Sequence, residues 1–240
     1  MGLLTSKIKC GNTFFTHFYL CPYLPLTAGM DTLSLSLLRF KQRIQPDLDA
    51  WIDCSRQLLG RLSFSPDAII IRALRHDETT ARPDFPSALD LLGHSLAIHL
   101  HCRYLPTLLT KSRTTLPNKH LTRHERQSQI QDVYHLTLTP TPTPSGPPTL
   151  TPAPTGPPHH PLQPPFITSA TPFLLIDDIL TTGATMRALI RTLRDHYPAC
   201  PIKTFTLTRA GYRCPIQPPA ARNEIHTAET LKTRIIANTV

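Results

Sequence analysis

The chain has 240 residues, of which 40% are apolar and 26 are proline, and its formal net charge is +9. This length allows one domain with a sizeable core, and no apolar run is long enough to predict a membrane span. The positive charge favours an anionic partner, such as a phosphorylated sugar, pyrophosphate or nucleic acid, or else a generally basic surface.

The six cysteines are scattered, and none forms a Cys-x-x-Cys pair, so neither a zinc ribbon nor a thioredoxin-type motif is expected. Reduced, packing cysteines are typical of a cytosolic protein. Prolines 22 and 25 interrupt the apolar stretch near the N-terminus, which argues against a signal peptide. We therefore expect a cytoplasmic protein.

Residues 1–30 show no clear period and predict an irregular N-terminal arm, followed by one domain over 31–240. Asp31 can cap a helix through Phe40, although the alternation of leucines there also allows a strand. Residues 48–62 follow helical spacing. Trp51 shares a face with leucines of that helix, which favours a core position over stacking on a base.

Residues 68–71 form a short apolar run that predicts a buried strand. Arg72 and Arg75 follow it directly, which makes this basic loop a candidate anion site. Residues 88–99 then have helical spacing. His99 and His101 are two apart, so on a helix they point to different faces, and helix-packing or surface histidines are favoured over a metal site.

Residues 110–138 begin as a polar, basic stretch that is typical of a mobile loop and end as an alternating strand over 133–138. Arg113 and Arg126 belong either to a solvated face or to a loop that closes on an anion. Residues 139–165 contain twelve prolines and predict a disordered, extended insertion, because proline lacks the N–H that a sheet requires.

Residues 173–185 carry the strongest pattern in the chain. An apolar run ends in two adjacent carboxylates, Asp177 and Asp178, and a short loop of Thr, Gly and Ala follows. The next residues, 186–197, have the spacing of an amphipathic helix. The order is therefore buried strand, acidic tip, small-residue loop and helix, and ligands of open α/β sheets bind at the carboxyl ends of such strands.

The chemistry of this loop points to a sugar phosphate. Its uncovered N–H groups lie at a helix N-terminus, where the dipole favours an anion, and Gly183 lets the backbone approach a ligand. The threonine hydroxyls add donors, so the loop predicts a cradle for one phosphate. Carboxylates repel phosphate, so Asp177 and Asp178 are expected to bind sugar hydroxyls or a metal ion. Together these features describe a ribose 5-phosphate. The alternative is an ordinary strand-to-helix turn with threonine caps. The expected phosphate-loop residues are Thr181, Thr182, Gly183, Ala184 and Thr185.

Two further segments complete the predicted fold. Residues 202–208 alternate and predict another strand, and residues 223–237 predict a last helix. Because strand, polar loop and helix recur, we expect one α/β domain with a central, mostly parallel sheet flanked by helices.

At residues 173–185 the sequence resembles the type I phosphoribosyltransferases, whose signature is an apolar strand, two acids and a Thr-Thr-Gly-x-Thr loop. The resemblance implies that Asp177 and Asp178 bind the ribose hydroxyls of 5-phosphoribosyl 1-pyrophosphate (PRPP), and that residues 181–185 bind its 5′-phosphate. It also implies Mg²⁺ bound with PRPP rather than by protein ligands alone, and a nucleobase-like acceptor. Arg72 and Arg75 are then candidates for pyrophosphate contact.

The outer segments are similar to the ComF-type branch of that family, which is associated with bacterial competence. Residues 38–41 resemble its early Leu-Lys segment, and Leu121, Glu125 and Arg126 match the spacing of another. The stretch 71–74 lacks the two prolines of the family's pyrophosphate loop. Two functions are therefore expected: a phosphoribosyltransferase, or a non-catalytic ComF-like protein acting in DNA uptake or regulation. The oligomeric state is not predicted.

Overall fold

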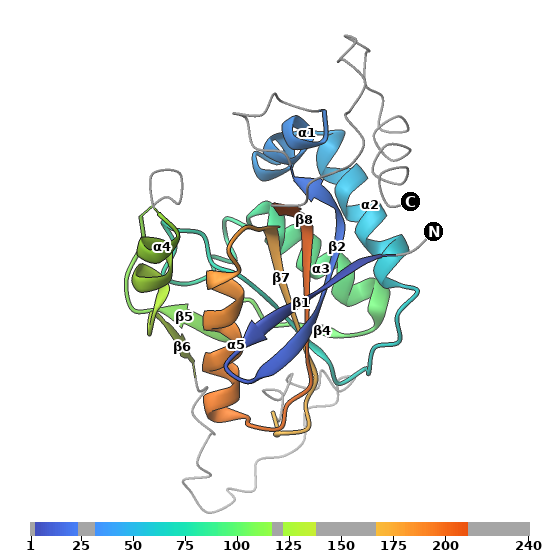
Figure 1. The fold of residues 1–240 in the computed structure, drawn as a ribbon. Helices are drawn as coiled ribbons and strands as arrows, with labels where there is room; N and C mark the ends of the chain where they lie inside the picture. The colour runs from blue at the N-terminus through green and yellow to red at the C-terminus, as the bar shows by residue number, and fades with distance from the viewer. Residues whose placement is uncertain (1–2, 24–31, 117–121, 138–166, 211–240) are drawn as a thin grey trace, which may run out of the picture.

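The computed structural model describes residues 3–23, 32–116, 122–137 and 167–210, and Figure 1 shows their arrangement. A twisted sheet forms the centre, and helices cover both of its faces. The elements are β1 (Leu4–Cys10), β2 (Thr13–Tyr23), α1 (Thr32–Lys41), α2 (Asp47–Leu59), β3 (Ile69–Arg72), α3 (Ala88–Leu100), β4 (Arg103–Tyr104), β5 (Leu109–Lys111), α4 (Arg123–Ile130), β6 (Tyr134–Leu136), β7 (Phe173–Leu180), α5 (Ala184–His196) and β8 (Ile202–Ala210).

The central sheet is mostly parallel, as the sequence predicted. Its strand order is β1-β2-β8-β7-β3-β4. The pairings β2–β8, β8–β7, β7–β3 and β3–β4 are parallel, and only the pairing of β1 with β2 is antiparallel. Strands β5 and β6 form a separate antiparallel pair. Because β7 lies between β8 and β3, its carboxyl end stands in the middle of the sheet's edge.

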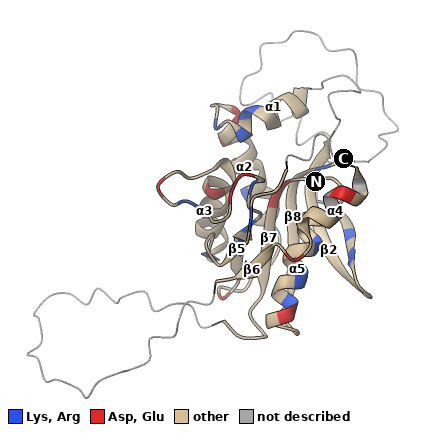
Figure 2. Cartoon of the chain, turned by 90° about the vertical axis from the view of Figure 1, so that its left-hand side faces the viewer, with Lys and Arg blue, Asp and Glu red and all other residues tan. Residues whose placement is uncertain are grey.

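Two hydrophobic cores lie on opposite faces of the sheet. In Figure 1, α5 lies to the left of β7 and β8 while α2 and α3 lie to the right, and Figure 2 shows α2 and α3 beside the strands from a direction turned by 90°. The first core contains Trp51, which is fully buried and donates a hydrogen bond from Nε1 to Ser36 Oγ at 3.0 Å. This confirms the predicted core position of Trp51. The second core packs Leu189 and Leu193 of α5 against Leu175 of β7.

The prediction of an irregular N-terminal arm is wrong for residues 4–23, which form the hairpin of β1 and β2. β2 lies between β1 and β8, so residues on both of its faces are buried, and the strand lacks the alternation that marks a half-exposed strand. A buried polar side chain within β2 further obscures the apolar pattern of the strand. His17 is fully buried between the hydroxyls of Thr204 and Thr206, at 2.9 and 3.1 Å.

The segment after β4 is more regular than a mobile loop. It contains β5, then α4, whose N-cap Thr122 accepts from the Glu125 N–H while the Glu125 carboxylate accepts from the Thr122 N–H. This reciprocal capping explains why a short polar stretch begins a helix there. The predicted strand over 133–138 is present as β6. The Pro-rich insertion at 139–165 and the helix expected over 223–237 lie outside the described residues.

Among the described residues, none of the helices has the length and apolar character that a membrane crossing requires. The same part of the chain holds no cluster of three or more His, Cys, Asp or Glu side chains arranged to bind a metal ion.

Candidate functional site

The loop between β7 and α5 ends in a glycine, which is the N-cap of α5. Gly183 is the N-cap, with a φ of 74°, in the left-handed region that favours glycine. It provides no side-chain cap, so the first N–H groups of α5 are left to be satisfied by other groups. The Thr182 hydroxyl accepts a hydrogen bond from the Ala184 N–H at 3.4 Å. This arrangement suits an anion.

A hollow of about 530 Å³, its open mouth included, joins this loop to three other segments. These segments are the loop after β3, the residues after β5, and α4. The hollow therefore lies at the carboxyl end of β7, where the sequence placed the ligand. Its lining residues are Leu74, His76, Thr115, Gln129, Ile130, Asp177, Ile179, Leu180, Thr181, Thr182, Gly183, Ala184, Thr185 and Met186.

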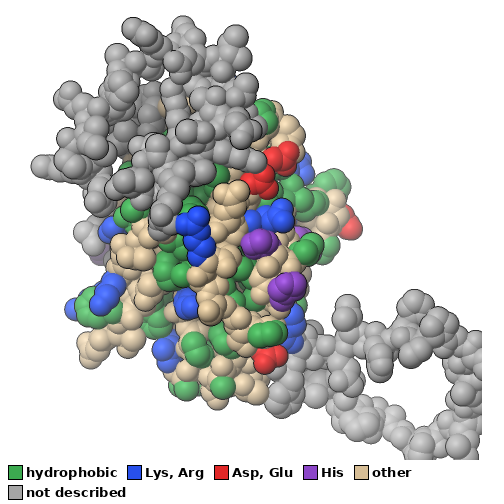
Figure 3. All heavy atoms as spheres, turned by 90° about the vertical axis from the view of Figure 1, so that its right-hand side faces the viewer, with side chains coloured by type: hydrophobic (Ala, Val, Ile, Leu, Met, Phe, Trp, Pro, Cys, Tyr) green, Lys and Arg blue, Asp and Glu red, His purple; other side chains and the backbone are tan. Residues whose placement is uncertain are grey.

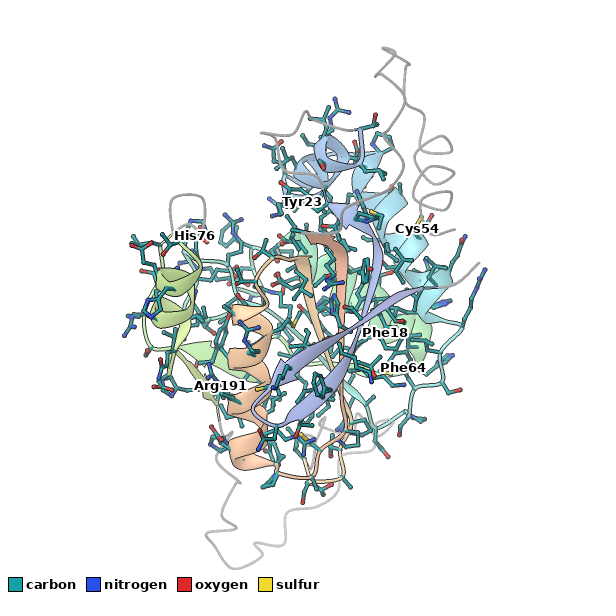
Figure 4. All side chains as sticks on the ribbon, in the orientation of Figure 1. Phe18, Tyr23, Cys54, Phe64, His76 and Arg191 are labelled. Atoms are coloured by element: carbon teal, nitrogen blue, oxygen red, sulfur yellow. The ribbon has the colours of Figure 1, made fainter. Side chains whose placement is uncertain are left out.

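Figure 4 shows how the two sides of this region are built. His76 lies on the α4 side of the loop that joins β7 to α5, and Tyr23 lies on the α1 side. The α4 side is held to the loop after β3 by backbone contact, since the Thr115 N–H donates to the His76 carbonyl at 2.8 Å. The side-chain amide of Gln129 on α4 binds the backbone of Leu116 twice: Nε2 donates to the Leu116 carbonyl and Oε1 accepts from the Leu116 N–H. These contacts fix the outer wall of the hollow.

The two acids have different surroundings. Asp177 lines the hollow together with all five predicted phosphate-loop residues. Its Oδ1 accepts from the Asp178 N–H at 2.8 Å. Burial and the negative charge of Asp178 raise the pKa of Asp177 to about 8, although that hydrogen bond and the positive charges of Lys41 and Arg72 act in the opposite direction. The raised pKa favours a proton on Asp177 near neutral pH.

Asp178 forms an ion pair with a residue of helix α1. Its Oδ2 lies 2.8 Å from Nζ of Lys41, which is the last residue of that helix. Burial alone would lower the pKa of Lys41, but the nearby carboxylate of Asp178 raises it overall. Sequence reasoning marked residues 38–41 only through the family resemblance. A contact between elements this far apart in the chain leaves no signal in spacing or periodicity.

The structure overturns the prediction that Arg72 contacts pyrophosphate. Its side chain is fully buried, and its guanidinium binds Asp90 Oδ1 at 2.6 Å and Glu78 Oε2 at 2.7 Å. Asp90 also accepts from the Tyr104 hydroxyl at 2.7 Å. A strand that ends in a buried arginine needs carboxylates beside it, because an unpaired buried charge is strongly destabilising. Arg72 thus secures the loop after β3 and is not exposed to a ligand.

Of the other predicted cations, neither Arg75 nor Arg113 lines the hollow. Arg75 is exposed and pairs with Asp77 at 3.2 Å. Arg113 is exposed on the segment after β5, and the side chain of Arg126 on α4 lies outside the described atoms. Lys111 is buried and donates from Nζ to the Arg75 carbonyl at 2.6 Å. Lys111 of β5 therefore holds the backbone of the loop after β3 in place.

Basic side chains do not form one continuous patch on the face shown in Figure 3. Outside the grey atoms, Lys and Arg are separated there by hydrophobic and polar side chains, and acidic side chains are also present. The visible part of this face gives no specific support to a nucleic-acid partner.

Comparison with known proteins adds little to this description. No protein-family model matches the sequence, and no curated protein matches it. Among solved structures, the chain is similar to an adenine phosphoribosyltransferase from Leishmania tarentolae, with a TM-score of 0.39 and 12% identity, over 86% of this chain and 94% of that chain. The ComF-type branch receives no support.

Proposed function

We propose that the protein binds PRPP and transfers its phosphoribosyl group to a nitrogen of a nucleobase or amine, releasing pyrophosphate. The observation that carries this proposal is the hollow at the end of β7, which joins one carboxylate of an acidic pair to a phosphate-binding type of loop. A sugar phosphate needs both features at once, since the phosphate requires N–H donors and the hydroxyls require acceptors.

Each part of the site has a chemical task in this proposal. Residues 181–185 bind the 5′-phosphate through N–H and hydroxyl groups at the start of α5. Asp177 accepts from a ribose hydroxyl, and Asp178 stands beside it. The loop around His76 also lines the hollow, and the pyrophosphate would extend toward it. Catalysis of this kind depends on positioning and electrostatics, because the carbon–oxygen bond lengthens and positive charge develops on the sugar.

Mg²⁺ would enter as part of the PRPP complex. Its coordination would come mainly from the oxygens of the ligand's phosphates, as is usual for Mg²⁺ bound with a phosphorylated substrate. When bound, Mg²⁺ neutralises charge on the leaving pyrophosphate.

The second candidate is a binding protein that keeps the sugar-phosphate site without catalysis, as in the ComF-like reading. One observation favours it. Of the two arginines predicted to contact pyrophosphate, Arg72 is buried in ion pairs and Arg75 is paired with Asp77. Among the described residues that line the hollow, this end offers His76 and backbone groups and no guanidinium group. A role in competence and a nucleic-acid partner remain proposals.

Pyrophosphate release decides between the two candidates. The protein is incubated with PRPP, Mg²⁺ and a panel of nucleobases, and phosphate is detected after addition of inorganic pyrophosphatase. Release that depends on one base supports the transferase, and the Asp177→Asn, Asp178→Asn double variant should abolish it. Binding of PRPP without release from any base supports the binding protein. If PRPP neither binds nor reacts, both candidates are wrong.

A further inference from the structure

Arg187, in the first turn of α5, makes an unusual contact with the phosphate loop. Its Nη1 donates to the Thr182 carbonyl oxygen at 2.9 Å. The guanidinium also lies close to Gly183, because a Cβ built on that glycine would be 3.1 Å from the same Nη1. Arg187 does not line the hollow, although its neighbours in the loop do. It therefore contacts the loop from a side that the hollow does not reach.

The direction of one peptide group follows from this contact. In a trans peptide the carbonyl and the N–H point in opposite directions. Because the Thr182 carbonyl is directed to Arg187, the Gly183 N–H of the same peptide is directed away from Arg187. Both Thr182 and Gly183 line the hollow, so this orientation presents an N–H donor on the ligand side. A flipped peptide would present a carbonyl oxygen, which repels phosphate.

We propose that Arg187 is a positioning residue for the 5′-phosphate: its hydrogen bond to the Thr182 carbonyl holds the Thr182–Gly183 peptide with its N–H toward the bound phosphate. The proposal rests on the sugar-phosphate site described above and assigns a role to a side chain outside it. The charge of the guanidinium makes its hydrogen bond to a neutral carbonyl stronger than one from a neutral donor. It also places positive charge behind a loop that receives a phosphate dianion.

The test compares three variants of Arg187 with a control on the same helix. Arg187→Met removes the donor, Arg187→Gln keeps a neutral donor, and Arg187→Lys keeps the charge. Arg191→Met is the matched control, because Arg191 is exposed farther along α5 and lines a different hollow (Figure 4). Binding of ribose 5-phosphate, PRPP with Mg²⁺, and pyrophosphate with Mg²⁺ is measured by calorimetry, and each variant is also melted.

Arg187→Met should weaken ribose 5-phosphate and PRPP by the same factor, about tenfold or more, since both carry the 5′-phosphate. Pyrophosphate binding and the Tm should change little, and Arg191→Met should bind like the wild type. The affinities of Arg187→Gln and Arg187→Lys for the two sugar phosphates should lie between those of Arg187→Met and the wild type. These two variants test the proposal if Arg187→Met does not fold.

Wild-type affinity for ribose 5-phosphate in the folded Arg187 variants would overturn this inference alone. Equal weakening of all three ligands together with a lower Tm would show a merely structural role and would also overturn it. If the wild-type protein binds neither sugar phosphate, the proposed function fails and this inference fails with it.

Discussion

The carboxyl of Asp177 carries the most distinctive chemistry of any single residue in the site. Its folded-state pKa is raised from the ordinary 3.8 to about 8, first by burial and then by the charge of Asp178. Between those two pH values the folded protein holds a proton that the unfolded chain has lost. Stability contributed by this group is therefore present below pH 3.8 and is lost as the pH rises toward 8.

Replacing Asp177 by Asn should remove that pH dependence. We expect the variant to gain stability relative to the wild type as the pH rises from 5 to 8, by about 2 kcal/mol, less than the full shift implies because the side chain lines the hollow and keeps partial contact with water. Urea unfolding of both proteins at several pH values measures the difference. A constant difference across this range would contradict the raised pKa.

Gly183 is the residue in the phosphate loop where backbone shape is most restrictive. Its φ of 74° disfavours any side chain, and an added Cβ would lie 3.1 Å from Arg187 Nη1 and 3.5 Å from a methyl group of Leu180. Gly183→Ala should lower the free energy of unfolding by about 1–2 kcal/mol and weaken sugar-phosphate binding. Gly11→Ala is a suitable control for the stability change, because Gly11 also has a positive φ, 57°, but an added Cβ there would meet no atom within 4 Å. Equal ribose 5-phosphate affinity in the two variants would argue against the loop as the phosphate site.

At the scale of elements, the contact between α1 and β7 connects a helix to the acidic pair. Lys41 and Asp178 are both only partly buried, so their ion pair is expected to contribute about 1 kcal/mol or less to stability. Its larger effect should be electrostatic, because Lys41 offsets the negative charge of Asp178 beside the place where an anionic ligand would bind.

Lys41→Met should therefore weaken PRPP binding several-fold while Lys41→Arg keeps most of it. Lys203→Met is the control for loss of one positive charge. Lys203 lies near the start of β8, which runs parallel to β7, so it is at the opposite edge of the sheet from the carboxyl end of β7. Calorimetric titration of the three variants compares them directly. If Lys41→Met and Lys203→Met bind PRPP equally, the ion pair plays no part in the site.

Elements with strong local patterns could be predicted from the sequence. The apolar run and small-residue loop at 173–185 gave the strand, the loop and the helix in the right order, because each depends on neighbouring residues. β2 was missed because a strand covered on both faces loses its alternation. The burial of Arg72 was missed because its partners, Glu78 and Asp90, are brought to it by a turn and by the packing of α3.

At the scale of the whole molecule, the sheet order determines where chemistry can occur. A mostly parallel sheet was predictable from the recurring strand-loop-helix units. The position of β7 between β8 and β3 was not, since register and order depend on contacts between distant strands. That order brings the loops after β3 and β7 to the same edge, with α1 on one side of it and α4 on the other. The predicted phosphate loop thereby shares one hollow with His76, which belongs to the basic loop after β3 that the sequence marked as a candidate anion site.

Calorimetric titration of the full chain with PRPP and Mg²⁺, in parallel with ribose 5-phosphate, tests the central claim most directly. The account predicts that both ligands bind, that PRPP binds more tightly, and that the Asp177→Asn, Asp178→Asn double variant loses affinity for both while remaining folded. Equal binding of the two ligands would limit the site to the sugar-phosphate half. Absence of binding by either ligand would contradict the assignment of this hollow as a phosphoribosyl site.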